Sequence, residues 1–141
     1  MRHQIAGYKL GRKKDARKGL RRTLINQLFT YSRIKTTRAK AMAIRGDAER
    51  LITLARNSAK GSDIEKVNAR RLAAARLNNA EIVKKLFDEI GPRFETRNGG
   101  YTRLFKLGPR LGDSSEMVVL ELVEQYANRM CVTGRKWHFT N

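Results

Sequence analysis

Gly91-Pro92-Arg93-Phe94-Glu95-Thr96-Arg97-Asn98-Gly99-Gly100-Tyr101-Thr102-Arg103 is the stretch where a helical pattern of apolar residues gives way to a strand pattern. The apolar face of the helix before it is formed by Ile82, Val83, Leu86, Phe87 and Ile90. Gly followed by Pro commonly ends a helix, because Gly accepts a left-handed cap and Pro cannot continue the backbone ladder. We therefore expect the helix to end at Gly91 and a turn at 98–100 to lead into a strand over 101–107.

Residues 93–103 of this stretch are called the glycine corner below. It combines cations, glycines and aromatic rings. Arginine forms bidentate contacts with phosphate, glycine allows a backbone to approach closely, and a ring can stack on a base. The alternative is a solvated loop whose glycines serve only the turn. We predict RNA contacts from Arg93, Arg97, Gly99, Gly100, Tyr101 and Arg103.

Upstream, the apolar spacing predicts three further helices and one short strand. The first helix is expected to begin with Asp15 as its N-cap, and β-leaning residues 33–36 follow it as a strand that pairs with a distant segment. Thr37 is expected to cap a second helix that runs to about Arg56. Its predicted apolar side is Ala41, Ile44, Ala48, Leu51, Ile52 and Ala55.

A capping box predicts where the third helix starts. Ser62 and Glu65 have the spacing at which each side chain bonds the other's free amide. This helix is expected to end near Leu77, and Asn78 or Asn79 begins the fourth. The cations Arg70, Arg71 and Arg76 of the third helix could face either RNA or solvent.

Downstream, two strands are predicted, at 101–107 and 117–123, with Val118, Leu120 and Leu122 on one face. The connection 108–116 is long for a hairpin and is expected to be mobile or bound to a partner. The element order predicts an α+β domain with a small three-stranded sheet covered by helices. We divide the chain into a flexible basic arm at 1–14, an α+β RNA-binding domain at 15–124 and a C-terminal tail of unknown role at 125–141.

The net charge of +18 and the pI near 11.0 favour a polyanionic partner. The charge is uneven, with +12 over residues 1–50, +4 over 51–100 and +2 over 101–141. Nucleic acid is therefore the first candidate, and it is expected to meet the N-terminal third. The candidate contacts there are Arg2, His3, Lys9, Arg12, Lys13, Lys14, Arg17, Lys18, Arg21, Arg22, Lys35, Arg38 and Lys40.

Other classes of function have weak sequence support. Cys131 is the only cysteine, so no internal disulfide forms, and no ligand cluster for a metal is expected. The N-terminus lacks the apolar core of a signal peptide, and no apolar run of about 18 residues is present, which favours a cytoplasmic protein. Nucleotide-binding and hydrolase motifs are absent from the sequence, so we expect neither catalysis nor a cofactor or small-molecule substrate.

The chain resembles the family of the bacterial large-subunit ribosomal protein seventeen over roughly residues 1–124. The resemblance includes Gly-Pro-Arg-Phe at 91–94 and Arg-Asn-Gly-Gly-Tyr-Thr-Arg at 97–103. It extends to Met-Arg-His at 1–3, Ile-Lys-Thr-Thr at 34–37 and Leu-Ile-Thr-Leu-Ala at 51–55. The chain departs from the family's usual Ser-Ser-His-Arg at 14–17, where it has Lys-Asp-Ala-Arg. The resemblance implies a non-catalytic constituent of the large ribosomal subunit that stabilises ribosomal RNA beside neighbouring ribosomal proteins.

Two alternatives of other classes remain open from the sequence. One is an RNA-directed enzyme that holds a substrate phosphate at Gly99-Gly100. The other is a DNA-compacting or membrane-surface protein that uses the same positive charge. Turnover of RNA that is lost on Arg97→Ala would favour the enzyme, and co-sedimentation with the large subunit separates a ribosomal protein from the other alternative.

Overall fold

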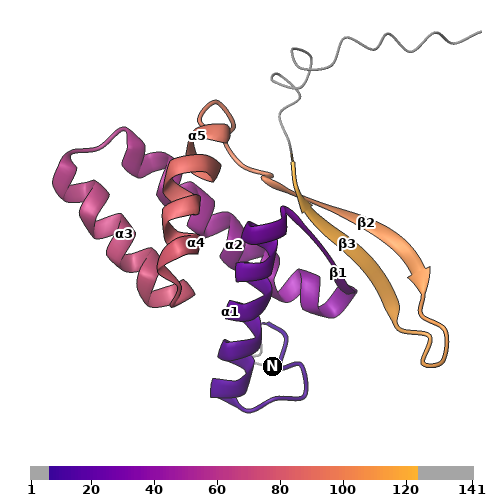
Figure 1. The fold of residues 1–141 in the computed structure, drawn as a ribbon. Helices are drawn as coiled ribbons and strands as arrows, with labels where there is room; N and C mark the ends of the chain where they lie inside the picture. The colour runs from indigo at the N-terminus through magenta and orange to yellow at the C-terminus, as the bar shows by residue number, and fades with distance from the viewer. Residues whose placement is uncertain (1–6, 124–141) are drawn as a thin grey trace, which may run out of the picture.

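An antiparallel sheet joins three strands that are far apart in the chain, in the order β1-β3-β2 (Figure 1). This computed structural model describes residues 7–123. The strands are β1 (Arg33–Thr37), β2 (Thr102–Pro109) and β3 (Glu116–Leu122). Thr36 of β1 lies opposite Val118 of β3, so the prediction that the first strand pairs with a distant segment is confirmed.

One face of this sheet packs against helices. Along β3, Val118, Leu120 and Leu122 are buried, whereas the residues between them are half-buried. This alternation follows from the strand's two-residue period, and it confirms the predicted apolar face. The helices α1 (Lys14–Tyr31) and α2 (Arg38–Ala59) contact the sheet on this side. The α+β fold expected from the element order is therefore confirmed.

The remaining helices are α3 (Asp63–Leu77), α4 (Ala80–Lys85), the π-helix η1 (Leu86–Ile90) and α5 (Gly91–Arg93). Every residue of the predicted apolar side of α2 is buried. The core also contains Leu28 and Phe29 of α1, together with Phe94 and Tyr101 from the glycine corner. Helices predicted to be amphipathic thus cover a single core with their apolar sides.

Capping side chains explain the starts of α3 and α4, whereas Thr37 occupies the N-cap position of α2 without a side-chain hydrogen bond. The Ser62 side chain accepts a hydrogen bond from the amide of Glu65, and the Glu65 carboxylate accepts one from the amide of Ser62. Asn79 accepts from the amides of Glu81 and Ile82, so it is Asn79 that begins α4. The prediction for Asp15 is wrong, because α1 begins at Lys14 and Asp15 lies in its first turn. A carboxylate there still favours the helix, because it lies near the positive end of the helix dipole.

The predicted helix end at Gly91 is also wrong. Gly91 has φ −54° and ψ −55°, and the chain continues through it as η1 passes into α5. Pro92 follows as the second residue of α5, directly after the π-helical turn, and the helix ends at Arg93. A Cβ atom on Gly91 would lie 3.3 Å from the carbonyl oxygen of Leu86 and 3.4 Å from Cβ of Ala55. Glycine is required here for the close approach to α2 and not for a left-handed cap.

The β2–β3 hairpin is longer than the sequence predicts, and it runs away from the helices toward its tip (Figure 1). Gly108 pairs with Met117 and Pro109 with Glu116, after a bulge that follows Lys106. The loop is thereby shortened to residues 110–115. Within it, the amide of Arg110 donates to the carbonyl of Ser115 over 2.9 Å, and Arg110 Nε donates to Asp113 Oδ1 over 3.0 Å.

Some predicted features fall outside the described residues. These are the first six residues of the basic arm, with Arg2 and His3, and the tail at 125–141, with Cys131. Within residues 7–123, none of the helices is both long enough and apolar enough to span a membrane.

Candidate nucleic-acid interface

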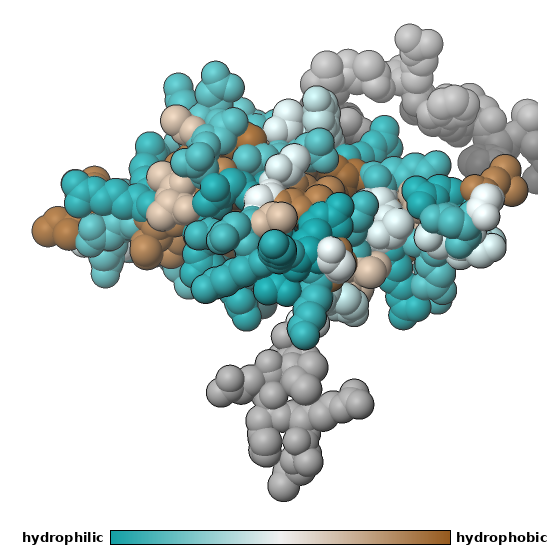
Figure 2. Space-filling model, turned by 90° about the horizontal axis from the view of Figure 1, so that it is seen from below, coloured by the Kyte–Doolittle hydropathy of each residue, from teal (hydrophilic) through white to brown (hydrophobic). Residues whose placement is uncertain are grey.

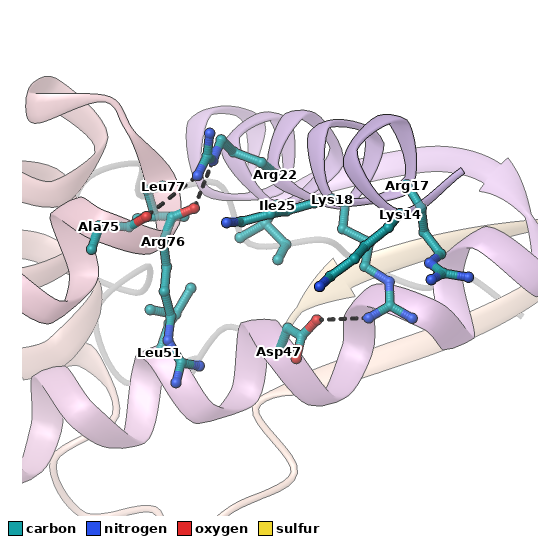
Figure 3. Close-up of a pocket in the computed structure, with 11 residues that line it drawn as sticks. Lys14, Arg17, Lys18, Arg22, Ile25, Asp47, Leu51, Ala75, Arg76 and Leu77 are labelled. Carbon is teal, nitrogen blue, oxygen red and sulfur yellow. Dashed lines mark hydrogen bonds and ion pairs between the residues drawn. The ribbon is translucent and has the colours of Figure 1, made fainter. Parts of the chain in front are cut away.

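Residues of three helices, including cations of α1 and α3, line a pocket of about 420 Å³ between α1, α2 and the end of α3 (Figure 3). We call it the cationic pocket. Ile25, Leu51 and Leu77 form its apolar part. Asp47 is the one acidic side chain among the described residues that line it. Its cations are Lys14, Arg17, Lys18, Arg21, Arg22 and Arg76.

The helical period of α1 places these cations together. Lys14, Lys18, Arg21 and Arg22 recur at spacings of three and four residues, which lie on one side of a helix. In Figure 3 the lysine side chains point from α1 into the space between α1 and α2. The face that carries the N-terminal end of α1 is mostly hydrophilic (Figure 2). The structure thus brings together all five of the α1 residues predicted to contact RNA.

Arg22 and the nearby Asn26 also stabilise the end of α3. Arg22 donates from Nε to the carbonyl of Arg76 over 2.8 Å and from Nη2 to the carbonyl of Ala75 over 3.3 Å. Asn26 donates to the carbonyl of Leu77 over 3.2 Å. The last carbonyls of a helix lack partners within it, and a positive charge is favourable there. Arg22 therefore holds α3 against α1 as well as adding charge to the pocket.

Little of the remaining positive charge in the pocket is neutralised. Arg21 Nη1 lies 3.6 Å from Asp47 Oδ2, and Arg50 Nη1 lies 3.4 Å from the other oxygen of the same carboxylate. One acid is thus shared by two arginines. Among the described residues, Lys14, Arg17 and Lys18 have no carboxylate partner within ion-pair distance. A polyanion would meet an uncompensated cluster of cations at this place.

The described part of the basic arm runs beside this pocket. A Cβ atom on Gly7 would lie 3.9 Å from Nη2 of Arg21. Arg12 donates to the carbonyl of Leu10 over 2.9 Å, which helps to form a turn before α1. Lys9 and Lys13 are exposed on the same segment. The predicted contacts at 9–14 are therefore adjacent to those of α1.

The three candidates at 35–40 lie at the join of β1 and α2. Lys35 is exposed on β1, and Lys40 is half-buried in the first turn of α2. Arg38 donates to Glu116 Oε2 over 2.9 Å. This contact raises the pKa of Arg38 and lowers that of Glu116, and the hydrogen bond is the larger cause in both groups. The positive charge of Arg38 is thus partly neutralised by Glu116 within the protein.

The glycine corner is held at the other end of the molecule by α2, near the top of Figure 1. Arg56, in the last turn of α2, donates from Nη1 to the carbonyl of Arg97 over 2.6 Å and to Asn98 Oδ1 over 2.8 Å. Arg97 Nε donates to the carbonyl of Gly99 over 3.0 Å. Gly99 and Gly100 have φ angles of 128° and 60°, so both need glycine's freedom at positive φ. Arg93 is half-buried and Arg103 is exposed on β2.

The structure corrects the role proposed for Tyr101. Its side chain is only 2% exposed and packs edge-on against Phe94, with ring centroids 5.1 Å apart. The Tyr101 carbonyl accepts a hydrogen bond from the amide of Val123 over 2.8 Å. A ring inside the core is not available to stack on a base, so the Tyr101 side chain positions the corner.

The sequence analysis left the role of Arg76 open between RNA and solvent, and it missed Arg56. Arg76 joins the cationic pocket from the end of α3, and Arg56 holds the glycine corner. The period of α3 places Arg76 in the last turn of its helix, but the pattern carries no sign that α1 lies alongside. Arg56 likewise lies in the last turn of its helix, α2, a position where a cation can bind main-chain carbonyls.

Comparison with known proteins identifies relatives over most of the chain. A family model described as Ribosomal protein L17 matches residues 20–123. A protein of Solibacter usitatus named large ribosomal subunit protein bL17 is 49% identical over 123 residues, covering 87% of this chain and 77% of the relative. Proteins of the same name from Caldanaerobacter subterraneus subsp. tengcongensis and Clostridium perfringens are 49% and 47% identical and cover 82% and 84% of this chain and 96% and 100% of the relatives. On these matches, the chain belongs to the ribosomal protein L17 family.

Proposed function

We propose that this protein is a structural constituent of the large ribosomal subunit in the bacterial cytoplasm, where it binds and stabilises ribosomal RNA. The cationic pocket carries this proposal, because six cations surround a single carboxylate there. The names of the relatives support the same assignment, since each is a large ribosomal subunit protein. Phosphate neutralisation by such a cluster supplies affinity without reading base sequence.

The contacts are assigned by position. Lys14, Arg17, Lys18 and Arg76 bind phosphates at the pocket, and the arm at 1–14 follows the RNA beyond it. Arg93 and Arg103 bind phosphates on the side of the glycine corner, and neighbouring ribosomal proteins complete the surroundings. If about eight phosphates are contacted, the logarithm of affinity falls with the logarithm of salt concentration at a slope of about −6 to −7.

A matched pair of double variants tests the proposal. K14A/K18A removes two pocket lysines, whereas K66A/K84A removes two exposed lysines of α3 and α4. Binding to large-subunit ribosomal RNA is measured by filter retention over a range of salt. We expect K14A/K18A to weaken binding and to reduce the slope by about 1.5 to 2, and the control to have a much smaller effect. Equal effects of the two pairs would remove the pocket from the interface, and a flat salt dependence of the wild type would exclude RNA binding.

Cell fractionation tests the ribosomal assignment itself. We expect the tagged protein to remain with the large subunit through a moderate-salt wash and sucrose gradient sedimentation. Recovery with the chromosome or with the membrane fraction would instead favour the DNA-compacting or membrane-surface alternative. Turnover of RNA by the purified protein, lost in R97A, would favour an enzyme.

A further inference from the structure

The face of the sheet opposite the helices is open within the described part of the chain. Along β3, the buried side chains alternate with Met117, Val119 and Glu121, which are half-buried and lie on the other face. The strand register places Arg33 and Arg103 on either side of Glu121, and Lys35 and Phe105 on either side of Val119. We call the surface formed by Arg33, Lys35, Arg103, Phe105, Val119 and Glu121 the open sheet face.

This surface combines cations with an exposed ring. The Phe105 side chain is 43% exposed, and the Arg103 guanidinium lies 5.9 Å from the ring centroid. Arg33, Lys35 and Arg103 are exposed, and none of them forms an ion pair with another described residue. Among the described residues, Glu121 is the only acid of the open sheet face, so the net charge of this face is positive. Adjacent strands are about 4.8 Å apart, which places Lys35 about 10 Å from Phe105.

We propose that the open sheet face binds an unpaired segment of RNA, with one base stacked on Phe105 and the flanking phosphates bound by Lys35, Arg33 and Arg103. The proposal rests on the proposed function and names the kind of RNA that this second surface takes. Unpaired bases stack on exposed aromatic side chains, and a sheet surface that carries such rings together with cations suits them. With Tyr101 buried, Phe105 is the ring of this region that is available for stacking.

Charge decides between RNA and a protein partner. The core of a protein–protein interface is depleted in charged residues, although arginine and aromatic residues are enriched there. Here three cations without ion-pair partners flank one ring and the half-buried Val119, and this composition complements a phosphate backbone with a base between its phosphates. A neighbouring protein on this face is therefore the competing outcome of the test.

Variants of Phe105 separate stacking from charge. The probe is a fluorescent unpaired RNA dodecamer, compared with an RNA duplex of equal charge. We expect F105A to weaken binding of the dodecamer by about 5- to 100-fold without changing the salt slope, and F105W to retain the affinity of the wild type. K35A is expected to reduce the salt slope by about 0.7 to 0.9. Because Phe105 is partly exposed, F105A is expected to fold, and its melting temperature checks this.

A photo-crosslinking residue placed at position 105 extends the test to the assembled large subunit. We expect the crosslink to join ribosomal RNA at an unpaired nucleotide. A crosslink to a neighbouring protein, or to residues 125–141 of this chain, would overturn the inference, as would unchanged dodecamer binding by F105A. None of these results contradicts RNA binding at the cationic pocket or the proposed function. The proposed function would be contradicted only if the wild-type protein showed no salt-dependent binding to RNA.

Discussion

Arg22 of α1 donates a hydrogen bond from its guanidinium to the main-chain carbonyl of Arg76 at the end of α3, over 2.8 Å. Two residues of like charge thus approach each other because one of them takes part through its backbone. The contact gives Arg22 a structural role that its neighbour Lys18 lacks.

We therefore expect R22A and K18A to have different effects. R22A leaves the carbonyls of Ala75 and Arg76 without this donor and is expected to lower the free energy of unfolding by about 1 kcal/mol. K18A is expected to change it by less than about 0.5 kcal/mol but to weaken RNA binding more than R22A does. Urea denaturation and filter binding measure the two effects. Similar stability losses in the two variants would show that the contact to α3 contributes nothing.

Two helical glycines are expected to respond in opposite directions to alanine. At Gly91 a new Cβ atom would meet the Leu86 carbonyl at 3.3 Å, so G91A is expected to destabilise the protein by about 1 to 3 kcal/mol. At Gly46 of α2 nothing lies within 4 Å, and G46A is expected to stabilise by up to about 1 kcal/mol. The midpoint of urea unfolding gives both values. If G91A left the stability unchanged, α2 and α5 would be able to move apart without loss of free energy.

The capping box at the start of α3 can be tested by a loss and a rescue. S62A removes the acceptor of the Glu65 amide and is expected to cost about 1 kcal/mol of stability. S62D keeps an acceptor at the same position and is expected to restore most of the loss. Thermal unfolding followed by circular dichroism measures both. If S62D is no more stable than S62A, the side-chain acceptor is not what makes serine stabilising at this N-cap.

The tip of the β2–β3 hairpin is expected to depend on pH. Hydrogen bonds from Arg110, and then from Ser115, hold the pKa of Asp113 well below its usual range. Because the folded state favours the carboxylate, this contribution to stability is full at neutral pH and is lost as the pH falls from the ordinary carboxyl range through the folded-state pKa. Carboxyl chemical shifts are expected to show Asp113 still ionised at about pH 3, and R110A to return its pKa toward about 3.9.

Arg38 and Glu116 provide the control for that titration. The hydrogen bond from Arg38 lowers the pKa of Glu116, so R38A is expected to raise it and to leave Asp113 unchanged. R110A is expected to have the reverse selectivity. If either variant shifted the pKa of both Asp113 and Glu116, the cause would be the change in overall charge. The two pKa values would then not depend on two separate contacts.

Local patterns were sufficient for much of the fold. The resemblance to the L17 family is confirmed by the family match, and with it the prediction that the chain is not an enzyme. The apolar sides of the helices, the capping box at Ser62 and a strand at 33–36 follow from spacing and local chemistry, and all are confirmed, with the strand one residue longer than predicted. These features depend on residues a few positions apart, which a sequence displays directly.

The features that the sequence could not supply depend on distant contacts. Gly91-Pro92 is a locally valid helix ending, but packing against Ala55 outweighs it and the helix continues. Tyr101 has the chemistry of a stacking ring, and only its position against Phe94 shows that it is buried. Arg76 joins the cationic pocket because α1 and α3 lie together, and helical periodicity does not reveal which helices are neighbours.

The strand order β1-β3-β2 has a consequence for synthesis of the chain. The central strand, at 116–122, is made last of the three, so neither outer strand has its partner until translation has passed this point. A nascent chain arrested earlier leaves the sheet-facing sides of α1 and α2 uncovered beside a dense positive charge. The sheet therefore forms only after β3 has emerged, and a chain interrupted before that point exposes apolar surface of the kind that chaperones and proteases recognise.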